Sequence, residues 1–345
     1  MKHEEIFPIN KEIGKQVKAH IDSLTKPVGS LGQLERIAVQ LAEMTGEHFP
    51  IVSPPAALLF AADHGVTEEG VSAYPKEVTA QMVENFLSGG AAMNVFSRQI
   101  GAKFAIVDVG VAKTVIHEKL ISRKINFGTK NFVKEDAMTE AEAHQALEIG
   151  KEEAAKLIEQ GAKCLIIGEM GIGNTTSASA LLAAMTEKSL ADLIGPGTGL
   201  TKEQMKGKRL VIERAINARK PDKKNPMDLI KKLGGFEIAA MAGAMLEAAK
   251  RRIPIILDGF ICTVSAILAM KINKRAQEYM LAGHLSAEPG HCAALEYLGK
   301  TPILDLKMRL GEGTGAALAF PIVEAAANML SGMATFVEAG VSEKK

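Results

Sequence analysis

Six short apolar runs, each followed by a polar loop and then by a helix-like segment, constrain the fold of this chain more than any other feature. The runs span residues 56–62, 104–107, 164–167, 253–257, 279–282 and 303–306. Continuous apolar strands that alternate with helices are typical of a parallel sheet covered by helices on both faces. The sequence therefore predicts an α/β fold with a mainly parallel, Rossmann-like sheet. Ligands bind such sheets at the carboxyl ends of the strands, so the loops after these runs should line the site.

The two ends of the chain have a different pattern, which predicts a small helical lobe. Apolar residues recur at helical spacing before residue 50, and an alanine-rich helix is expected from Phe320 to about Val337. Because chain ends often lie together, we expect a large α/β domain at 51–319 and a small helical domain made of 1–50 with 320–345. The lysine-rich stretch 111–135 interrupts the alternation and is interpreted as a protruding segment, with a small hairpin as one interpretation.

Composition and motif spacing exclude several classes of protein. Lys+Arg (41) and Asp+Glu (40) nearly cancel, and the chain has no Trp and three Tyr, which disfavours nucleic acid as a partner. The N-terminus lacks the apolar core of a signal peptide, and no apolar run reaches the roughly 18 residues of a membrane span. No histidine or cysteine spacing is typical of a metal site. We therefore predict a cytoplasmic protein with small-molecule partners, no membrane association, and no metal or cofactor.

The loop Gly168–Thr176 follows a predicted strand and opens a predicted helix. Its spacing is similar to that of a nucleotide-binding P-loop, but Asn174 occupies the position of the phosphate-binding lysine. Thr176 likewise replaces the third glycine of a dinucleotide-binding fingerprint. Backbone N–H groups at a glycine-rich helix N-terminus still favour an anion such as a phosphate monoester. An ordinary helix cap is the alternative interpretation.

Two glutamates at predicted strand ends could carry chemistry. Glu312 lies between Gly311 and Gly313, which leave space for a ligand near the backbone, and it is a candidate general base. Glu169 could act with it on either side of an anomeric carbon, whose substitution has an oxocarbenium-like transition state. The alternatives are a solvated turn for Glu312, and a Glu169 that binds the backbone of a neighbouring loop. The histidines His64, His284 and His291 are interpreted as residues that brace the core or loops.

Nine sequence blocks resemble the nicotinate-nucleotide:dimethylbenzimidazole phosphoribosyltransferase family, in family order and over essentially the whole chain. They are KPVGSLGQLE at 26–35, DHGV at 63–66, GVS at 70–72, VTAQM at 78–82, DVG at 108–110, GEMGIGNTT at 168–176, LDGF at 257–260, SAEPGH at 286–291 and LGEGTG at 310–315. The resemblance implies a homodimeric enzyme that transfers the 5-phosphoribosyl group of nicotinate mononucleotide to 5,6-dimethylbenzimidazole. The expected products are α-ribazole 5′-phosphate and nicotinate.

The resemblance also implies roles for individual residues. Glu312 corresponds to the general base of the family and Glu169 to its second functional carboxylate. The residues expected to bind the phosphate and ribose are Gly171, Gly173, Asn174, Thr175, Thr176, Lys208, Ser286, Gly311 and Gly313. Gln81 and Ser72 are expected beside the benzimidazole, while Tyr74 lies in a stretch that leaves the choice of base open. Two alternatives remain: a phosphoribosyltransferase or nucleosidase with another acceptor, and a non-catalytic protein that binds a nucleotide or a lower ligand.

Overall fold

The structure, a computed structural model, describes residues 5–186, 188–195, 197 and 199–342. It contains a seven-stranded sheet in the order β3-β2-β1-β4-β5-β6-β7, and every pairing is parallel. The strands are β1 (Pro55–Ala62), β2 (Lys103–Gly110), β3 (Leu120–Ser122), β4 (Cys164–Met170), β5 (Ile255–Leu257), β6 (Met280–His284) and β7 (Pro302–Leu304). Six of them are the predicted apolar runs, and the predicted α/β class is confirmed.

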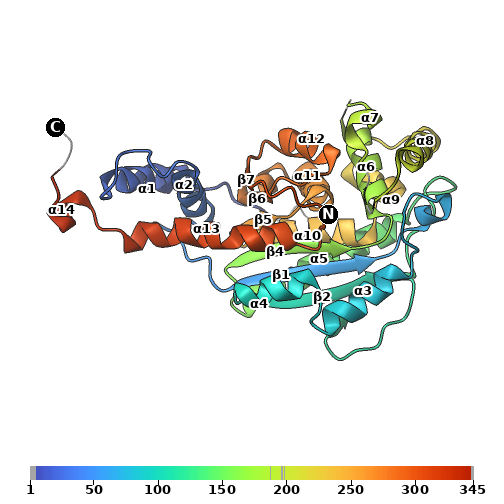
Figure 1. Cartoon of the computed structure of the whole chain (residues 1–345), viewed down its shortest axis with the longest axis horizontal. Helices are drawn as coiled ribbons and strands as arrows, with labels where there is room; N and C mark the ends of the chain where they lie inside the picture. Colours follow the sequence, from blue (N-terminus) through green and yellow to red (C-terminus); the bar gives the residue numbers. More distant parts are fainter. Residues whose placement is uncertain (1–4, 187, 196, 198, 343–345) are drawn as a thin grey trace.

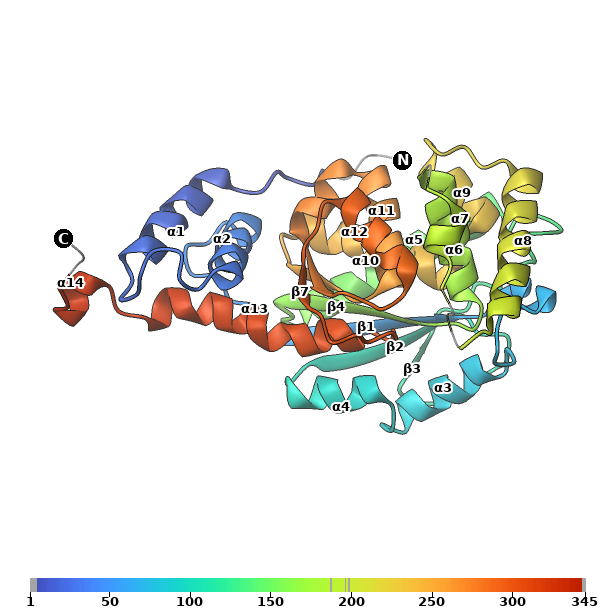
Figure 2. The same cartoon turned by 45° about the horizontal axis from the view of Figure 1, so that its top comes forward.

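Helices cover both faces of the sheet, as Figures 1 and 2 show. The helices are α1 (Lys11–Ser23), α2 (Gln33–Thr45), α3 (Val78–Leu87), α4 (Ala92–Gln99), α5 (Glu140–Glu159), α6 (Asn174–Met185), α7 (Leu190–Leu193), α8 (Lys202–Arg219), α9 (Pro226–Leu233), α10 (Phe236–Lys250), α11 (Phe260–Ile272), α12 (Pro289–Leu298), α13 (Thr314–Gly332) and α14 (Phe336–Ala339). Two 3-10 helices, η1 (Gly65–Glu69) and η2 (Lys274–Tyr279), complete the described elements. Helices α3, α4 and α13 pack on one face, and α10 and α11 pack on the other, with α5 against α10. Because both faces are covered, every residue of β1 and β4 is buried.

The segment 111–135 contains no hairpin, so that interpretation was wrong. Its strand β3 pairs in parallel with β2, with Ile106 opposite Leu120. Two of its basic residues pair with buried carboxylates: Lys124 lies 2.8 Å from Asp108 of β2, and Arg123 lies 2.6 Å from Glu153 of α5. Other lysines of the segment, such as Lys113 and Lys134, are exposed. Part of the basic composition therefore reflects ion pairs with buried carboxylates beside the sheet edge.

The N-terminal helices pack against the second half of α13 and form the helical lobe seen on the left of Figure 1. An antiparallel bridge joins Leu24 to Thr335, and His20 Nε2 lies 2.8 Å from the carbonyl oxygen of Leu330. The predicted boundary at 319/320 falls inside α13, so the two parts of the chain share one helix. The C-terminal helix ends at Gly332, earlier than predicted, and the short α14 follows it. The division into two domains stays a prediction.

Helix α13 is long and apolar enough to cross a membrane by length and composition. It nevertheless packs against β5 and β6, and 56% of its apolar 18-residue window is buried inside the protein. These contacts are those of a core helix.

Candidate active site

A cavity of about 550 Å³ opens at the carboxyl ends of β4, β5, β6 and β7. Its lining comes from four segments that follow these strands, within 169–175, 258–262, 286–288 and 309–312, from residues of 74–82 in and before α3, and from Gly197. Strands β1 and β4 are neighbours from which the chain proceeds to opposite edges of the sheet. Open α/β sheets bind ligands beside this change of direction.

A second cavity, of about 720 Å³, lies between α6, α11 and α12 and is lined by four lysines. None of the predicted site residues lines it. Its glutamate, Glu296, binds Lys188, so this cavity has no carboxylate free for proton transfer among its lining residues. The cavity at the strand ends is therefore the candidate active site.

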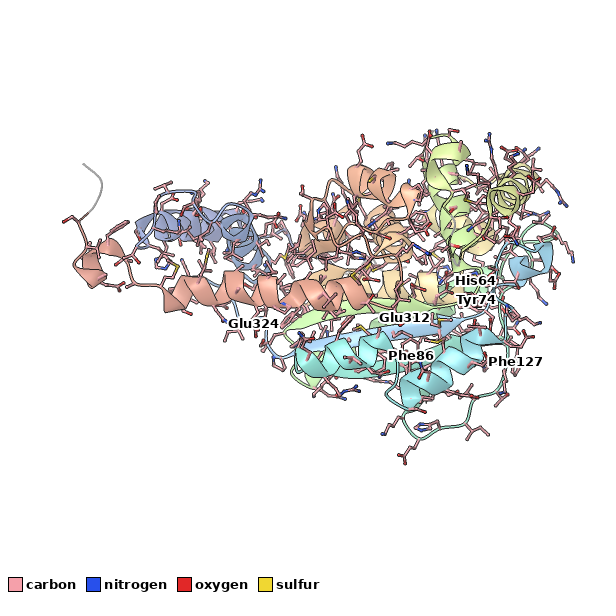
Figure 3. All side chains as sticks on the ribbon, in the orientation of Figure 1. His64, Tyr74, Phe86, Phe127, Glu312 and Glu324 are labelled. Carbon is pink, nitrogen blue, oxygen red and sulfur yellow. The ribbon has the colours of Figure 1, made fainter. Side chains whose placement is uncertain are left out.

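Glu312 lies in this cavity on a strained turn, beside the start of α13 (Figure 3). Residues 311, 312 and 313 have φ values of 86°, 65° and 88°, a left-handed region that glycine adopts freely and glutamate rarely does. Side chains held in this region cost about 1–3 kcal/mol and persist where the surroundings fix them. Gly168 allows the turn to lie against β4, since a Cβ there would stand 2.4 Å from the carbonyl oxygen of Glu312.

The carboxyl group of Glu312 is buried, and one of its oxygens has no hydrogen-bond partner among the described residues. It is 6% exposed, and its Oε2 accepts no hydrogen bond from any described residue. Burial, with a smaller contribution from the nearby charge of Asp258, raises the pKa of Glu312 to about 7. A general base works best when its pKa lies near the working pH, so these surroundings suit that role. The interpretation of Glu312 as a solvated surface residue is wrong.

Glu169 is bound to the backbone and side chains around it. Its Oε1 accepts a hydrogen bond from the backbone N–H of Glu312 at 3.4 Å, and its Oε2 accepts one from the Asn174 amide. Burial, followed by the charges of Asp258 and Glu237, raises the pKa of Glu169 to about 8. Glu169 therefore binds the backbone of a neighbouring loop, which is the contact that the alternative interpretation predicted.

Asp258 holds the other side of the Glu312 turn. Its Oδ2 accepts from the N–H of Gly313 at 3.1 Å, and its Oδ1 accepts from the N–H of Gly315 at 2.7 Å. Burial alone would raise the pKa of Asp258, but the His284 contact and the backbone N–H groups of Gly313 and Ala316 outweigh it and lower the pKa. No role was predicted for Asp258 from the sequence, although its position directly after β5 was a visible signal.

The predicted phosphate loop divides into residues that line the cavity and residues that support it. Gly171, Asn174 and Thr175 line the cavity. Gly173 and Thr176 do not, since Gly173 packs against His64 and η1, and Thr176 is fully buried.

Lys208 reaches this loop from α8. Its Nζ donates a hydrogen bond to Thr175 Oγ1 at 2.9 Å, although the side chain is only 2% exposed. Burial lowers the pKa of Lys208 to about 8, against the opposing effect of Glu288. The structure therefore brings the predicted lysine to the predicted loop.

Several residues that line the cavity on the side of the predicted phosphate loop had no predicted role. They are Glu288, Arg309 and the first residues of α11, from Phe260 to Cys262. Arg309 donates to the carbonyl oxygen of Gly197 at 3.1 Å, and the predicted residue Ser286 also lines the cavity. Glu288 and Ser286 occur in one block, so that block signalled a functional loop.

The opposite wall of the cavity is apolar. Val78 and Met82, one turn apart on α3, lie there with Met170, Tyr74 and Leu310. The two residues predicted for the base do not line the cavity: Gln81 is exposed, and Ser72 is partly buried. Their part in base binding stays a prediction. Apolar residues four apart in a helix were the signal for Val78 and Met82.

The histidines are buried bracing residues, as predicted. His64 Nε2 lies 2.6 Å from Glu237 Oε1 behind the phosphate loop. His284 lies 3.5 Å from Asp258, and His291 contacts the backbone N–H of Ser286 at 2.8 Å. Within the described residues, no group of three His, Cys, Asp or Glu side chains is arranged to hold a metal ion.

Comparison with known proteins relates the whole chain to one family. A family model described as phosphoribosyltransferase matches residues 6–341. The nicotinate-nucleotide–dimethylbenzimidazole phosphoribosyltransferase of Chloroflexus aggregans is 47% identical over 341 residues, which cover 99% of this chain and 97% of that protein. The protein of the same name from Halalkalibacterium halodurans is 47% identical over 337 residues, which cover 98% of this chain and 94% of that protein.

Solved structures are similar over the same length. The crystal structure of nicotinate-nucleotide–dimethylbenzimidazole phosphoribosyltransferase from Thermus thermophilus superimposes with a TM-score of 0.93 at 44% identity, covering 97% of this chain and 100% of that chain. A crystal structure described as CobT from the same organism has a TM-score of 0.94 at 46% identity, covering 96% of this chain and 100% of that chain.

Proposed function

The chain belongs to the nicotinate-nucleotide:dimethylbenzimidazole phosphoribosyltransferase family, and from this membership and the site we infer how it performs the reaction of that family. The protein transfers the 5-phosphoribosyl group of nicotinate mononucleotide to 5,6-dimethylbenzimidazole, a step of cobalamin assembly. The products are α-ribazole 5′-phosphate and nicotinate. The chemistry requires one base and two binding regions.

Glu312 is proposed as the general base, and its unpartnered carboxylate oxygen in the cavity is the observation that carries this assignment. One benzimidazole nitrogen attacks C1′ of the ribose while the C1′–N bond to the pyridinium breaks, and the bonding pair leaves with nicotinate. The other benzimidazole nitrogen loses its proton to Glu312. Because attack and departure occur on opposite faces, the β-nucleotide gives an α-product. The pyridinium departs as a neutral ring nitrogen, so this departure needs no acid.

Glu169 is proposed as a positioning residue rather than a second base. One of its oxygens accepts from the Glu312 N–H and the other from Asn174. With Asp258 on the other side of the turn, two buried carboxylates hold the backbone around Glu312. This arrangement supports a division of roles in which Glu312 moves the proton and Glu169 fixes the turn that presents it.

The phosphate and the base are proposed to occupy opposite sides of the cavity. The residues proposed to contact the phosphate and ribose are the cavity-lining Gly171, Asn174, Thr175, Ser286 and Gly311. Lys208 lies beside Thr175, and Gly173, Thr176 and Gly313, which are outside the lining, are proposed to support these loops. Lys208 and the N–H groups at the start of α6 supply positive charge and donors for the phosphate. The flat base fits the apolar wall around Val78 and Met82, with Ser72 and Gln81 proposed at its edge.

Incubation with nicotinate mononucleotide and a panel of benzimidazoles, purines and phenols tests the function. We expect nicotinate release that depends on a benzimidazole, together with a ribotide product of the same stoichiometry. Nicotinate release without any acceptor would indicate a nucleosidase, and preference for a purine or a phenol would indicate another acceptor. No release with any acceptor would favour a non-catalytic binding protein.

We also propose a homodimer in the cytoplasm, as the family resemblance implies. Exposed apolar side chains on and beside the helical lobe, among them Phe49, Ile51 and Val337, offer surface to a second copy. The molar mass from light scattering tests the dimer, and a monomer at assay concentration contradicts it. Fractionation of the source cells tests the location.

A further inference from the structure

His291 occupies a buried position between two loops that line the active site. It lies in the first turn of α12 and is 0% exposed. Helix α12 packs beside α11 (Figures 1 and 2). Thr263, in the first turn of α11, is equally buried. The loop before α11 follows β5, and the loop before α12 follows β6. Thr263 and His291 therefore lie directly behind two neighbouring loops that line the cavity.

The hydrogen bonds around His291 have one consistent direction. The backbone N–H of Ser286 donates to His291 Nδ1 at 2.8 Å, so Nδ1 carries no proton. Thr263 Oγ1 donates its single hydrogen to the carbonyl oxygen of Gly259 at 2.9 Å. Thr263 must therefore accept from His291 Nε2, 2.9 Å away, and Nε2 carries the ring proton. The ring is neutral and every one of its polar atoms is used.

This chain of bonds joins backbone groups that border the cavity. At one end is Gly259 in the loop after β5, and at the other is Ser286 in the loop after β6. Both line the cavity, as does Glu288, whose N–H donates to Ser286 Oγ at 3.3 Å. Burial, with the neighbouring His284, lowers the pKa of His291 to about 3, so the ring stays neutral throughout the working range.

We propose that His291 is a positioning residue for the phosphoribosyl donor: as a neutral Nε2–H imidazole it locks the Gly259 and Ser286 loops in the geometry that binds nicotinate mononucleotide. It touches neither the donor nor the acceptor base. Its effect is to hold Ser286 in place before the donor arrives, which removes the cost of ordering that loop on binding. The inference rests on the proposed function, because donor binding is the quantity that it changes.

Two variants break the lock, which is the chain of hydrogen bonds from Gly259 through Thr263 and His291 to Ser286, at different points. Thr263→Val removes the hydroxyl group with little change of shape and leaves the Nε2–H without an acceptor. His291→Asn keeps an acceptor near the Nδ1 position but does not reach Thr263. The matched control is Ser265→Ala, because Ser265 is buried in the same helix and its hydroxyl donates to the carbonyl oxygen of Ile261 at 3.1 Å without contacting the Ser286 loop.

We expect both lock variants to raise KM for nicotinate mononucleotide about tenfold, the effect of one unsatisfied buried group, with KM for the base and kcat changed less than about threefold. The Ser265→Ala variant should match the wild type in all three parameters. A general loss of packing would instead alter both KM values and kcat together, which would overturn the positioning role. Unchanged KM for the donor in Thr263→Val would overturn it as well.

Nitrogen NMR of the ring tests the lock without any assay of activity. In ¹⁵N-histidine-labelled protein the signals of His291 are those that disappear in His291→Asn. We expect them to show a neutral ring with a protonated Nε2, to shift in Thr263→Val and to stay in place in Ser265→Ala. An Nδ1–H tautomer or a protonated ring near neutral pH would overturn the inference. An inactive wild type that still has the Nε2–H ring would refute the proposed function and leave the lock itself supported, so the two failures are distinguishable.

Discussion

Replacement of Glu312 by glutamine is the most direct test of the catalytic assignment. Glutamine is nearly isosteric and adopts the same backbone at φ 65° as readily as glutamate, so the turn and its contacts to Glu169 and Asp258 should persist. The amide cannot accept the benzimidazole proton. A positioned general base contributes roughly 10²–10⁴ in rate, and we expect kcat to fall by at least about 100-fold.

The pH dependence gives this prediction a second and independent readout. Because the pKa of Glu312 is raised to about 7, the wild-type rate should fall about tenfold for each pH unit below 7 and reach a plateau above it. The Glu312→Gln rate should lose this acid limb and be flat between about pH 5.5 and 8. Steady-state rates of nicotinate release across this range, with the base saturating, measure both effects.

A second consequence concerns stability and has the opposite sign with pH. The pKa of Glu312 is higher in the folded protein than its ordinary value of 4.5, so the folded state binds the proton more tightly than the unfolded state. The resulting stabilisation is complete below pH 4.5 and is lost as the pH rises through 7. The Glu312→Gln variant should therefore resist thermal unfolding better than the wild type at pH 8.

The control is Glu118→Gln, an exposed glutamate outside the cavity lining, which should behave as the wild type does. Turnover of Glu312→Gln within a factor of about ten of the wild type would refute the assignment of Glu312 as the base. An acid limb that stays at the same pH in Glu312→Gln would also refute this assignment, and it would favour Glu169 as the base. The double variant with Glu169→Gln then decides between them, since residues that act as one unit give non-additive losses.

Three further variants test the parts that surround this base. Asp258→Asn removes the charge that helps to raise the pKa of Glu312, so the acid limb of kcat/KM should move to lower pH. The same variant weakens the cap that Asp258 provides for the N–H groups at the start of α13, so the free energy of unfolding in urea titrations should fall by about 1–2 kcal/mol. Lys208→Met should raise KM for nicotinate mononucleotide by about tenfold or more, while KM for the base stays constant. In the wild type, donor binding should weaken above pH 8, where Lys208 loses its charge. Gly168→Ala places a Cβ 2.4 Å from the Glu312 carbonyl oxygen, so kcat should fall although no reacting group is altered, and a crystal structure should show the turn displaced. A normal kcat in Gly168→Ala would mean that the turn tolerates displacement.

The strands were predictable because their signal is local. Six buried runs, bounded by polar loops, are enough to define a parallel sheet, and the position of a loop after a strand places its residues at the carboxyl edge. Strand β3 was missed because its three residues are flanked by lysines, and a lysine that will pair with buried Asp108 cannot be told from one in solvent without the partner. The same local pattern placed Glu169 and Glu312 at one edge, but it could not show that one binds the backbone of the other.

Which residues line the cavity and which support it depends on contacts between residues far apart in the sequence. Asp258 binds the start of α13 across 55 to 58 positions, and this distance gives no periodic signal. Gly173 and Thr176 were grouped with the cavity-lining residues of their loop because a motif does not say which of its backbone groups face inward. Gln81 and Val78 share a helix, and only the packing of α3 on the sheet decides that Val78 turns to the cavity.

Helix α13 gives the molecule a mechanical property that neither end of the helix has alone. It starts directly after the Glu312 turn and continues for 19 residues, about 28 Å, into contact with α1 and α2. Pro321 lies inside this helix and has no N–H to donate, so the hydrogen bonding of α13 is interrupted between the Glu312 turn and the lobe, and the helix can bend there. The residues of the lobe are remote from the cavity, yet they contact the same helix that begins at the Glu312 turn.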